Sequence, residues 1–149
     1  PKVIEFNVRF GDPETQPVML RLQSDLVDLV EAAIDGRLDT TGAQWDPRPS
    51  LGVVMAAAPY PDTPRTGDVI VGLDDVPAMA KVFHACTALD AEGRVVSAGG
   101  RVLCVAALGE SVSDAQRNAY AGVAKVRWTN EFHRTDIGWR AIARERADA

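Results

Sequence analysis

The stretch RVLCVAAL, residues 101–108, constrains the fold more than any other part of the sequence. It is almost continuously apolar, yet it is far shorter than the roughly 20 residues that a membrane helix needs. A short apolar run bounded by turn signals is typical of a buried strand. We therefore expect a buried strand over 101–108, entered through a sharp bend at 98–100, where two glycines could let the backbone approach a ligand closely.

Several other segments have the composition and alternation of strands. They are expected at 51–58, 68–73, 81–89 and 94–97. A helix with one apolar side follows the 101–108 strand, and either Ser111 or Ser113 can cap its first turn. The pattern predicts an α+β fold: a mostly antiparallel sheet with a covering helix.

We expect a short turn or helix over the last segment, 135–147. We expect Ile137, Trp139 and Ile142 to point into the core, together with Trp128. His84 is interpreted as a structural hydrogen-bonding residue rather than a base.

The first residues read as a separate unit. Positions 3–10 alternate between apolar and polar side chains, which predicts a half-buried strand. A loop at 11–15 and one or two helices up to Gly36 follow. We divide the chain into 1–48, with this strand, loop and helices, and 49–149, with the sheet and the covering helix. Because the strand pattern starts directly after Pro1, we expect the chain to be a piece whose upstream part pairs with that strand.

Composition excludes some classes of function. The chain has 149 residues, 46% of them apolar and 25% charged, and a formal net charge of −5. A negative charge argues against general nucleic-acid binding, which depends on clustered lysine and arginine. No membrane span and no secretory leader are visible, so we expect a cytoplasmic protein. Cys86 and Cys104 stand in apolar segments without a CxxC pair, which favours buried, reduced thiols.

The polar face of the predicted first strand carries the clearest candidate chemistry. Glu5, Asn7 and Arg9 alternate along the strand, so they would project from one face about 6 to 7 Å apart. A carboxylate beside an amide oxygen suits Mg²⁺, and an arginine beside them could stabilise a phosphoryl group. The alternative is an ordinary polar sheet face with an Arg–Glu pair, and the short pattern alone favours it.

A longer stretch of sequence favours the metal and phosphoryl site over the ordinary polar sheet face. The string EFNVRFGDPETQPVMLRLQSDL resembles the end of the ATP-grasp domain of the phosphoribosylamine-glycine ligase family. The later strings SLGVVMAA, TGDVIVGL, KVFHA, GGRVLCV and DIGWRA resemble the C-terminal domain of the same family, in order and at the same spacing. The resemblance covers essentially the whole chain. It departs from the family at Cys86 and Pro59, where the family usually or often has glycine.

This resemblance implies a function for the parent enzyme. Such ligases use ATP and Mg²⁺ or Mn²⁺ to join glycine to 5-phosphoribosylamine through glycyl phosphate, in purine biosynthesis. It also implies that residues 1–48 are the end of an ATP-grasp domain. Carried over by motif, Glu5 and Asn7 would bind the metal ion, and Arg9 would be the catalytic residue that stabilises the transferred phosphoryl group.

The resemblance further implies substrate contacts in two loops. Asp12 could hold the ammonium of glycine or the incoming amine, whereas Glu14 is favoured as an ordinary helix-entry acid. Gly99, Gly100 and Arg101 could grip the ribose phosphate. The alternative for the second loop is a bulge followed by a surface arginine.

Two alternatives to a working ligase remain. The chain by itself lacks the N-terminal domain and the nucleotide-clamping ATP-grasp lobes, so we expect the isolated piece to be an inactive module. A different ATP-grasp ligase or carboxylase could share the first-strand pattern, although GGRVLCV and DIGWRA argue against it.

Overall fold

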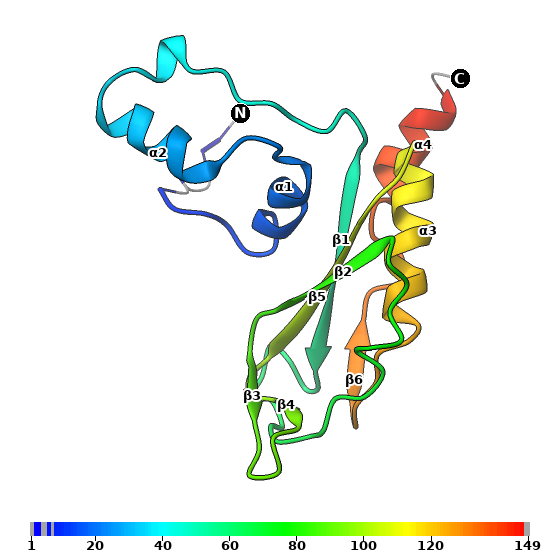
Figure 1. Cartoon of the computed structure of the whole chain (residues 1–149). Coiled ribbons are helices and arrows are strands. Elements are labelled where there is room, and N and C mark those ends of the chain that lie inside the picture. The colour runs from blue at the N-terminus through cyan, green and yellow to red at the C-terminus, as the bar shows by residue number, and fades with distance from the viewer. Residues whose placement is uncertain (1, 4–5, 7, 148–149) are drawn as a thin grey trace.

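A four-stranded antiparallel sheet forms the centre of the chain in this computed structural model, which describes residues 2–3, 6 and 8–147. The strands are β1 (Ser50–Ala57), β2 (Ala80–His84), β5 (Arg101–Leu108) and β6 (Glu131–His133), in the order β2-β5-β1-β6. Helices cover the sheet from opposite sides (Figure 1). The predicted α+β class with a mostly antiparallel sheet is confirmed.

The two long apolar strands pair with each other in the middle of the sheet. The β1–β5 register runs from Ser50 opposite Leu108 to Met55 opposite Leu103, and an irregularity follows Met55. All the residues of β5 except its first and last are buried. The apolar run therefore forms a strand because both of its faces are covered.

Helix α3 (Val112–Val123) covers one face of the sheet. Ser111 caps it by accepting a hydrogen bond from the backbone N–H of Asp114 at 3.1 Å, so the Ser111 alternative is the correct one. Ala115, Ala119 and Val123 point inward and pack with the core residues of β1 and β5. Trp128, which is 7% exposed, belongs to the same core, as expected.

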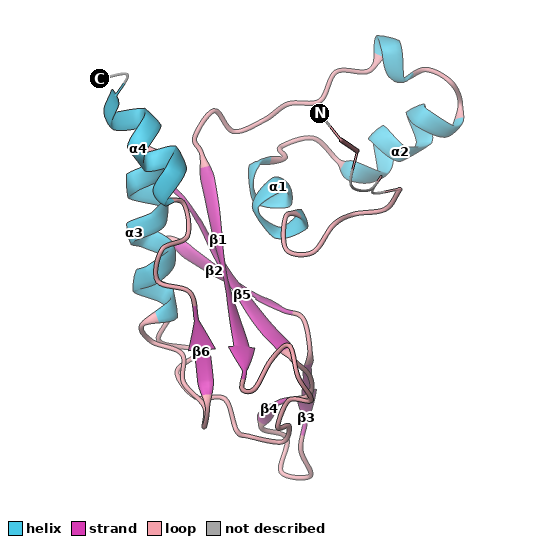
Figure 2. Cartoon of the chain, turned by 180° about the vertical axis from the view of Figure 1, so that it is seen from behind, coloured by secondary structure: helices cyan, strands magenta, loops and turns pink. Residues whose placement is uncertain are grey.

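Helix α1 (Thr15–Arg21) covers the opposite face. The Ser50 hydroxyl donates a hydrogen bond to the carbonyl oxygen of Pro17 at 2.7 Å. A methyl group added at Gly52 would lie 3.0 Å from the Pro17 ring, so glycine lets the helix approach the sheet closely. Helix α2 (Leu26–Ile34) and the short 3-10 helix η1 (Leu38–Thr40) extend away from the sheet (Figure 2).

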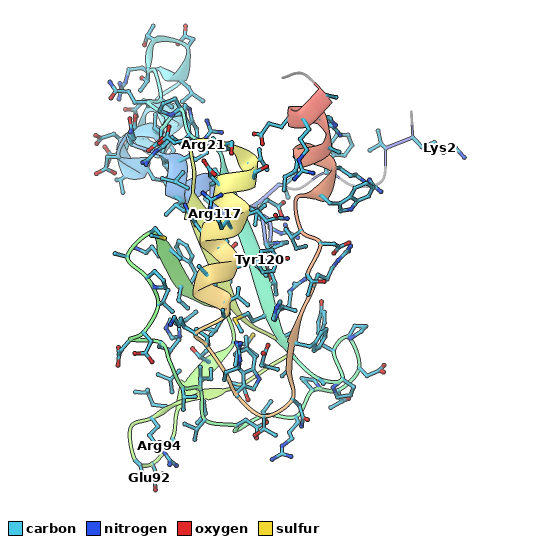
Figure 3. The ribbon with its side chains drawn as sticks, turned by 90° about the vertical axis from the view of Figure 1, so that its right-hand side faces the viewer. Lys2, Arg21, Glu92, Arg94, Arg117 and Tyr120 are labelled. Carbon is cyan, nitrogen blue, oxygen red and sulfur yellow. The ribbon has the colours of Figure 1, made fainter. Side chains whose placement is uncertain are left out.

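A small hairpin of β3 (Thr87–Leu89) and β4 (Val95–Ser97) projects from the other end of the molecule. Figure 3 shows Glu92 and Arg94 together at its tip. Arg94 bonds to Asp90 at 2.7 Å and to Glu92 at 3.1 Å, and these contacts close the turn.

Helix α4 (Trp139–Ala147) ends the described chain and packs against α3. Ile142 is buried as expected, and Ile137 is partly buried against the core. The prediction for Trp139 is wrong. Its side chain is 53% exposed and lies beneath the guanidinium of Arg140, which is 5.2 Å from the ring centroid.

Three strand predictions need correction. Among residues 3–10, those that the structure describes form no strand. Segment 68–73 is extended but makes only isolated bridges, because Val69 pairs with Val96 whereas Val71 pairs with Arg127. Segment 81–89 is two strands in two different sheets, β2 and β3.

The cysteines differ from each other. Cys104 is buried in β5, as expected, but Cys86 is exposed in the turn between β2 and β3, and both thiols are free. Within the described part of the chain, no helix has the length and apolar character needed to cross a membrane.

Candidate functional site

The first-strand candidates can be placed only in part. Glu5 and Asn7, the predicted metal ligands, lie outside the described residues. Arg9 is exposed, and its guanidinium donates a hydrogen bond to the carbonyl oxygen of Phe10 at 3.2 Å. In the described part of the chain, no group of three or more His, Cys, Asp or Glu residues could hold a metal ion. The metal and phosphoryl roles of these three residues therefore stay predictions.

The loop candidates Asp12 and Arg101 meet in space. An Arg101 guanidinium nitrogen lies 3.0 Å from an Asp12 carboxylate oxygen. The same guanidinium lies over the ring of Tyr60, 5.9 Å from its centroid. These residues line a cavity of about 510 Å³, which we call the Asp12 cavity; Gln16, Asp62 and Cys86 also line it. Residues far apart in the sequence therefore form one pocket with charged groups in its lining.

The glycine pair before Arg101 has a packing function. A methyl group added at Gly100 would lie 2.4 Å from a carbon of the Tyr60 ring, and one at Gly99 would lie 2.8 Å from Cβ of Cys86. Side chains of the protein itself thus make the close approach that glycine permits here. The expected sharp bend is confirmed, because the chain leaves the small sheet after β4 and enters the large one at β5. A phosphate contact at Gly99, Gly100 or Arg101 stays a prediction.

A second hollow adjoins the Asp12 cavity. Its volume is about 320 Å³, and its floor consists of the β1 residues Gly52, Val54 and Ala56. We call it the apolar hollow. It shares the lining residues Tyr60 and Arg101 with the Asp12 cavity, so the two hollows are neighbours. Tyr60 was not predicted as a site residue, because its place between two prolines gives no periodic signal.

Near these two hollows, burial changes the pKa of a titratable group, the Cys104 thiol. Burial raises the pKa of the Cys104 thiol to about 11, and the nearby Asp12 carboxylate adds to that effect.

His84 and Asp68, which also belong to the motifs singled out in the sequence, have structural roles. His84 contacts the hydroxyl of Thr87 at 3.0 Å, as expected for a hydrogen-bonding residue. Asp68 is 9% exposed and pairs with Arg65 at 3.0 Å. Its backbone N–H donates to the Ser97 hydroxyl at 3.2 Å and its carbonyl oxygen accepts from the Ser97 N–H at 2.9 Å, and these two bonds hold the segment beside β4.

The mixed α+β fold agrees with a match to a known protein family. A family model described as "Phosphoribosylglycinamide synthetase, C domain" matches residues 50–140. The chain belongs to this family.

Individual relatives agree with the family match. A phosphoribosylamine-glycine ligase of Xanthomonas campestris pv. campestris is 80% identical over 146 residues, covering 98% of this chain and 34% of the relative. One from Pseudomonas syringae pv. tomato is 63% identical over 149 residues, covering 99% of this chain and 34% of that relative. The chain thus spans about a third of the length of these curated relatives.

The fold is also similar to a solved structure. The crystal structure of phosphoribosylamine-glycine ligase from Thermotoga maritima matches with a TM-score of 0.72 and 33% sequence identity. The match covers 91% of this chain and 33% of that one. The similarity therefore extends beyond residues 50–140 and includes part of the segment before the sheet.

Proposed function

We propose that this chain is the C-terminal part of a phosphoribosylamine-glycine ligase, beginning at the end of its ATP-grasp domain. The observation that carries the proposal is the 80% identity, over nearly the whole chain, to a relative with that name. The reaction joins glycine to 5-phosphoribosylamine in purine biosynthesis, and we assign it to the cytoplasm.

The chemistry proceeds in two steps. The glycine carboxylate attacks the terminal phosphorus of ATP, so that ADP leaves and glycyl phosphate forms. The amine of phosphoribosylamine then attacks the acyl carbon, inorganic phosphate leaves, and the amide of glycinamide ribonucleotide forms. Both steps depend on alignment and charge neutralisation more than on covalent catalysis by the protein.

The residues of this chain have distinct proposed roles. Glu5 and Asn7 would hold Mg²⁺ or Mn²⁺ through hard oxygen donors, which is the donor chemistry that Mg²⁺ prefers. The bound ion would neutralise phosphate charge on ATP. Arg9 would stabilise the phosphoryl group as it is transferred, because its exposed guanidinium can donate to several phosphate oxygens.

The Asp12 cavity suits an amine-bearing substrate. Its lining carries two aspartates, Asp12 and Asp62, against one arginine, Arg101, which leaves a net charge of −1. A negative lining favours a cation such as the ammonium of glycine over an anion. We therefore assign Asp12 to the contact with glycine or with the amine of phosphoribosylamine, with Gly99 and Gly100 shaping the wall through Cys86 and Tyr60.

The exposed apolar side chains near the start of the chain support a partner within the same enzyme. Phe6 is 82% exposed, Val8 is 94% exposed, and Ile34 on α2 is 80% exposed. Large apolar side chains exposed to this degree are compatible with a protein interface. We propose that this surface packs against the N-terminal domain and the ATP-grasp lobes, and that the 149-residue chain alone is inactive.

The test uses the full-length ligase and measures phosphate release from ATP. Release should require glycine and phosphoribosylamine together, and release driven by bicarbonate or another acid would favour a different ATP-grasp enzyme. Glu5→Ala should abolish turnover and leave the circular dichroism spectrum unchanged. Glu92→Ala, which removes an exposed carboxylate at the tip of the β3–β4 hairpin, is the matched control and should keep full activity. A fully active Glu5→Ala enzyme would remove the metal assignment.

A further inference from the structure

Helix α1 and the loop before it are attached to opposite ends of the β1–β5 strand pair. In the loop, the carboxylate of Asp12 pairs with Arg101, the first residue of β5. In the helix, the carbonyl oxygen of Pro17 accepts the hydrogen bond from Ser50, the first residue of β1. Because the two strands are antiparallel, their first residues lie at opposite ends of the pair. The loop and the helix therefore follow the strands, with α1 beside β1 (Figure 1).

The last turn of α1 is held by the segment before β1. The Arg21 guanidinium donates two hydrogen bonds, of 3.1 and 3.0 Å, to the carbonyl oxygen of Asp46. The backbone N–H of Asp46 donates to the carbonyl oxygen of Arg21 at 2.8 Å. Leu22 and Trp45 form an antiparallel bridge beside these bonds. Hydrogen bonds from Arg48 lower the pKa of Asp46 to about 2, so this carboxylate stays charged at neutral pH. Both ends of α1 are thus fixed to the chain that leads into the sheet.

Between these ends, Gly52 on β1 sets how closely α1 approaches the sheet. A methyl group at position 52 would lie 3.0 and 3.4 Å from two ring carbons of Pro17 and 3.1 Å from the sulfur of Cys104. The thiol can turn about its side-chain bond, whereas the proline ring is fixed to the helix backbone. Since carbon atoms in contact are normally about 3.5–4.0 Å apart, a side chain at position 52 would lift α1 by about 0.5–1 Å.

A shift of α1 reaches the Asp12 cavity through the first turn of the helix. The backbone N–H of Thr15 donates to the carbonyl oxygen of Gly11 at 3.2 Å, and the Thr15 hydroxyl bonds to the same oxygen. Gly11 is buried and directly precedes Asp12. Because Arg101 belongs to β5 and Asp12 to the loop, lifting the helix would separate two charged groups that line the cavity.

We propose that Gly52 is a positioning residue of the ligase, which acts through Pro17 and α1 to set the place of Asp12 in its cavity. The inference rests on the proposed function for the ligand of Asp12, which is the amine of glycine or of phosphoribosylamine. A displacement of about 1 Å at a reacting group can change a rate by a factor of about 100. The close approach that glycine permits between sheet and helix is therefore large enough to matter for the reaction.

The first experiment follows the position of α1 in the 149-residue chain through Cys104. This residue is opposite Val54 in the β1–β5 register, so its side chain shares a sheet face with Gly52, and it is 2% exposed. In a Cys86→Ser background, Gly52→Ala should make a thiol reagent label Cys104 at least about tenfold faster. The rate should not change with urea below the unfolding transition, because a local shift of α1, rather than global unfolding, exposes the thiol.

Two variants make the labelling test specific. Pro17→Ala removes the two ring carbons that the methyl group would meet, so Gly52→Ala/Pro17→Ala should be labelled at the same rate as Pro17→Ala. Gly42→Ala is the matched control, because nothing lies within 4 Å of its added methyl group, and it should leave the rate unchanged. The proposal is overturned if Gly52→Ala does not accelerate labelling, if it does so equally without the Pro17 ring, or if Gly42→Ala has the same effect.

The second experiment measures steady-state kinetics of the full-length ligase. Gly52→Ala should raise the KM for glycine or for phosphoribosylamine at least about tenfold. The KM for ATP should stay unchanged, because Asp12 is assigned to the amine rather than to the nucleotide. In the Pro17→Ala background, the same substitution should raise the affected KM by less than about threefold. A lower kcat with every KM unchanged would mean only that less enzyme is folded, and it would overturn the positioning role.

The two experiments separate this inference from the proposed function. If the wild-type enzyme releases no phosphate from ATP with glycine and phosphoribosylamine, the proposed function fails, and the labelling of Cys104 still tests whether Gly52 sets the position of α1. If the wild-type enzyme uses both substrates and the Gly52→Ala enzyme has the same KM values, only the inference fails.

Discussion

Replacing Gly72 by alanine should destabilise the chain more than the same change at Gly67, although both glycines belong to the motif TGDVIVGL. The two residues have nearly the same backbone conformation, with φ of +81° and +86°. A left-handed conformation costs an alanine about 1–2 kcal/mol, so this part of the loss is common to both variants. They differ in what surrounds the added methyl group.

At Gly72 the methyl carbon would lie 2.0 Å from the backbone carbonyl oxygen of Lys125. Contacts of Cβ closer than 3.0 Å essentially do not occur, so the two segments must separate by about 1 Å, the difference between these distances. This separation strains the Val71–Arg127 bridge, whose two backbone hydrogen bonds are 2.9 and 3.1 Å long. Each is worth about 0.5–1.5 kcal/mol.

The sum predicts a loss of about 2–5 kcal/mol for Gly72→Ala. For Gly67→Ala, where nothing lies within 4 Å of the added methyl group, it predicts about 1–2 kcal/mol. Urea unfolding followed by far-ultraviolet circular dichroism measures both free energies. If the two variants lose the same stability, the steric argument is refuted, and the bridge between 68–73 and the segment after α3 contributes little.

Two further predictions concern titratable groups. Backbone hydrogen bonds from Val112 and Ser113 lower the pKa of Glu145, so its stabilising contribution is complete above the ordinary carboxyl pKa and is lost as the pH falls through the lowered value. At neutral pH the wild-type chain should therefore unfold at a higher urea concentration than Glu145→Gln, and the difference between the two midpoints should shrink in acid. A difference that does not change with pH would contradict this. A thiol reagent at neutral pH should label Cys86 in the native chain and Cys104 only after denaturation, because Cys104 is buried and has a pKa of about 11; rapid native labelling of Cys104 would contradict its burial.

The elements that were located correctly from the sequence have a pattern within their own residues that predicts them. β5 is an uninterrupted apolar run, and α3 combines a serine cap with alanines and a valine at helical spacing. Segment 68–73 shows why alternation alone misleads. Its residues alternate, but Val69 and Val71 pair with different partners, so no continuous ladder forms. β6 has only three residues, which is too short for a periodic pattern to reveal.

In the candidate site, too, some residues were indicated by the sequence, whereas their contacts were visible only in the structure. Asp12 and Arg101 were both selected from the sequence, but their 3.0 Å contact follows from the docking of the loop before α1 beside β5. Tyr60 was missed because a residue in a proline-rich connection has no periodic signal, although its ring lies against Gly100 and Arg101. The exposure of Trp139 likewise depends on how α4 packs on α3.

The amino-acid sequence alone determined the family, the α+β class and the central strands, because these depend on local composition and on strings of residues that are read in order. Only the tertiary structure decided which polar groups face one another. Arg101 pairs with Asp12, and Glu145 turns to the start of α3, whereas Arg140 and Arg144 have no acidic partner among the residues that the structure describes. Electrostatic interactions depend on distances between segments remote in sequence, and folding alone sets those distances.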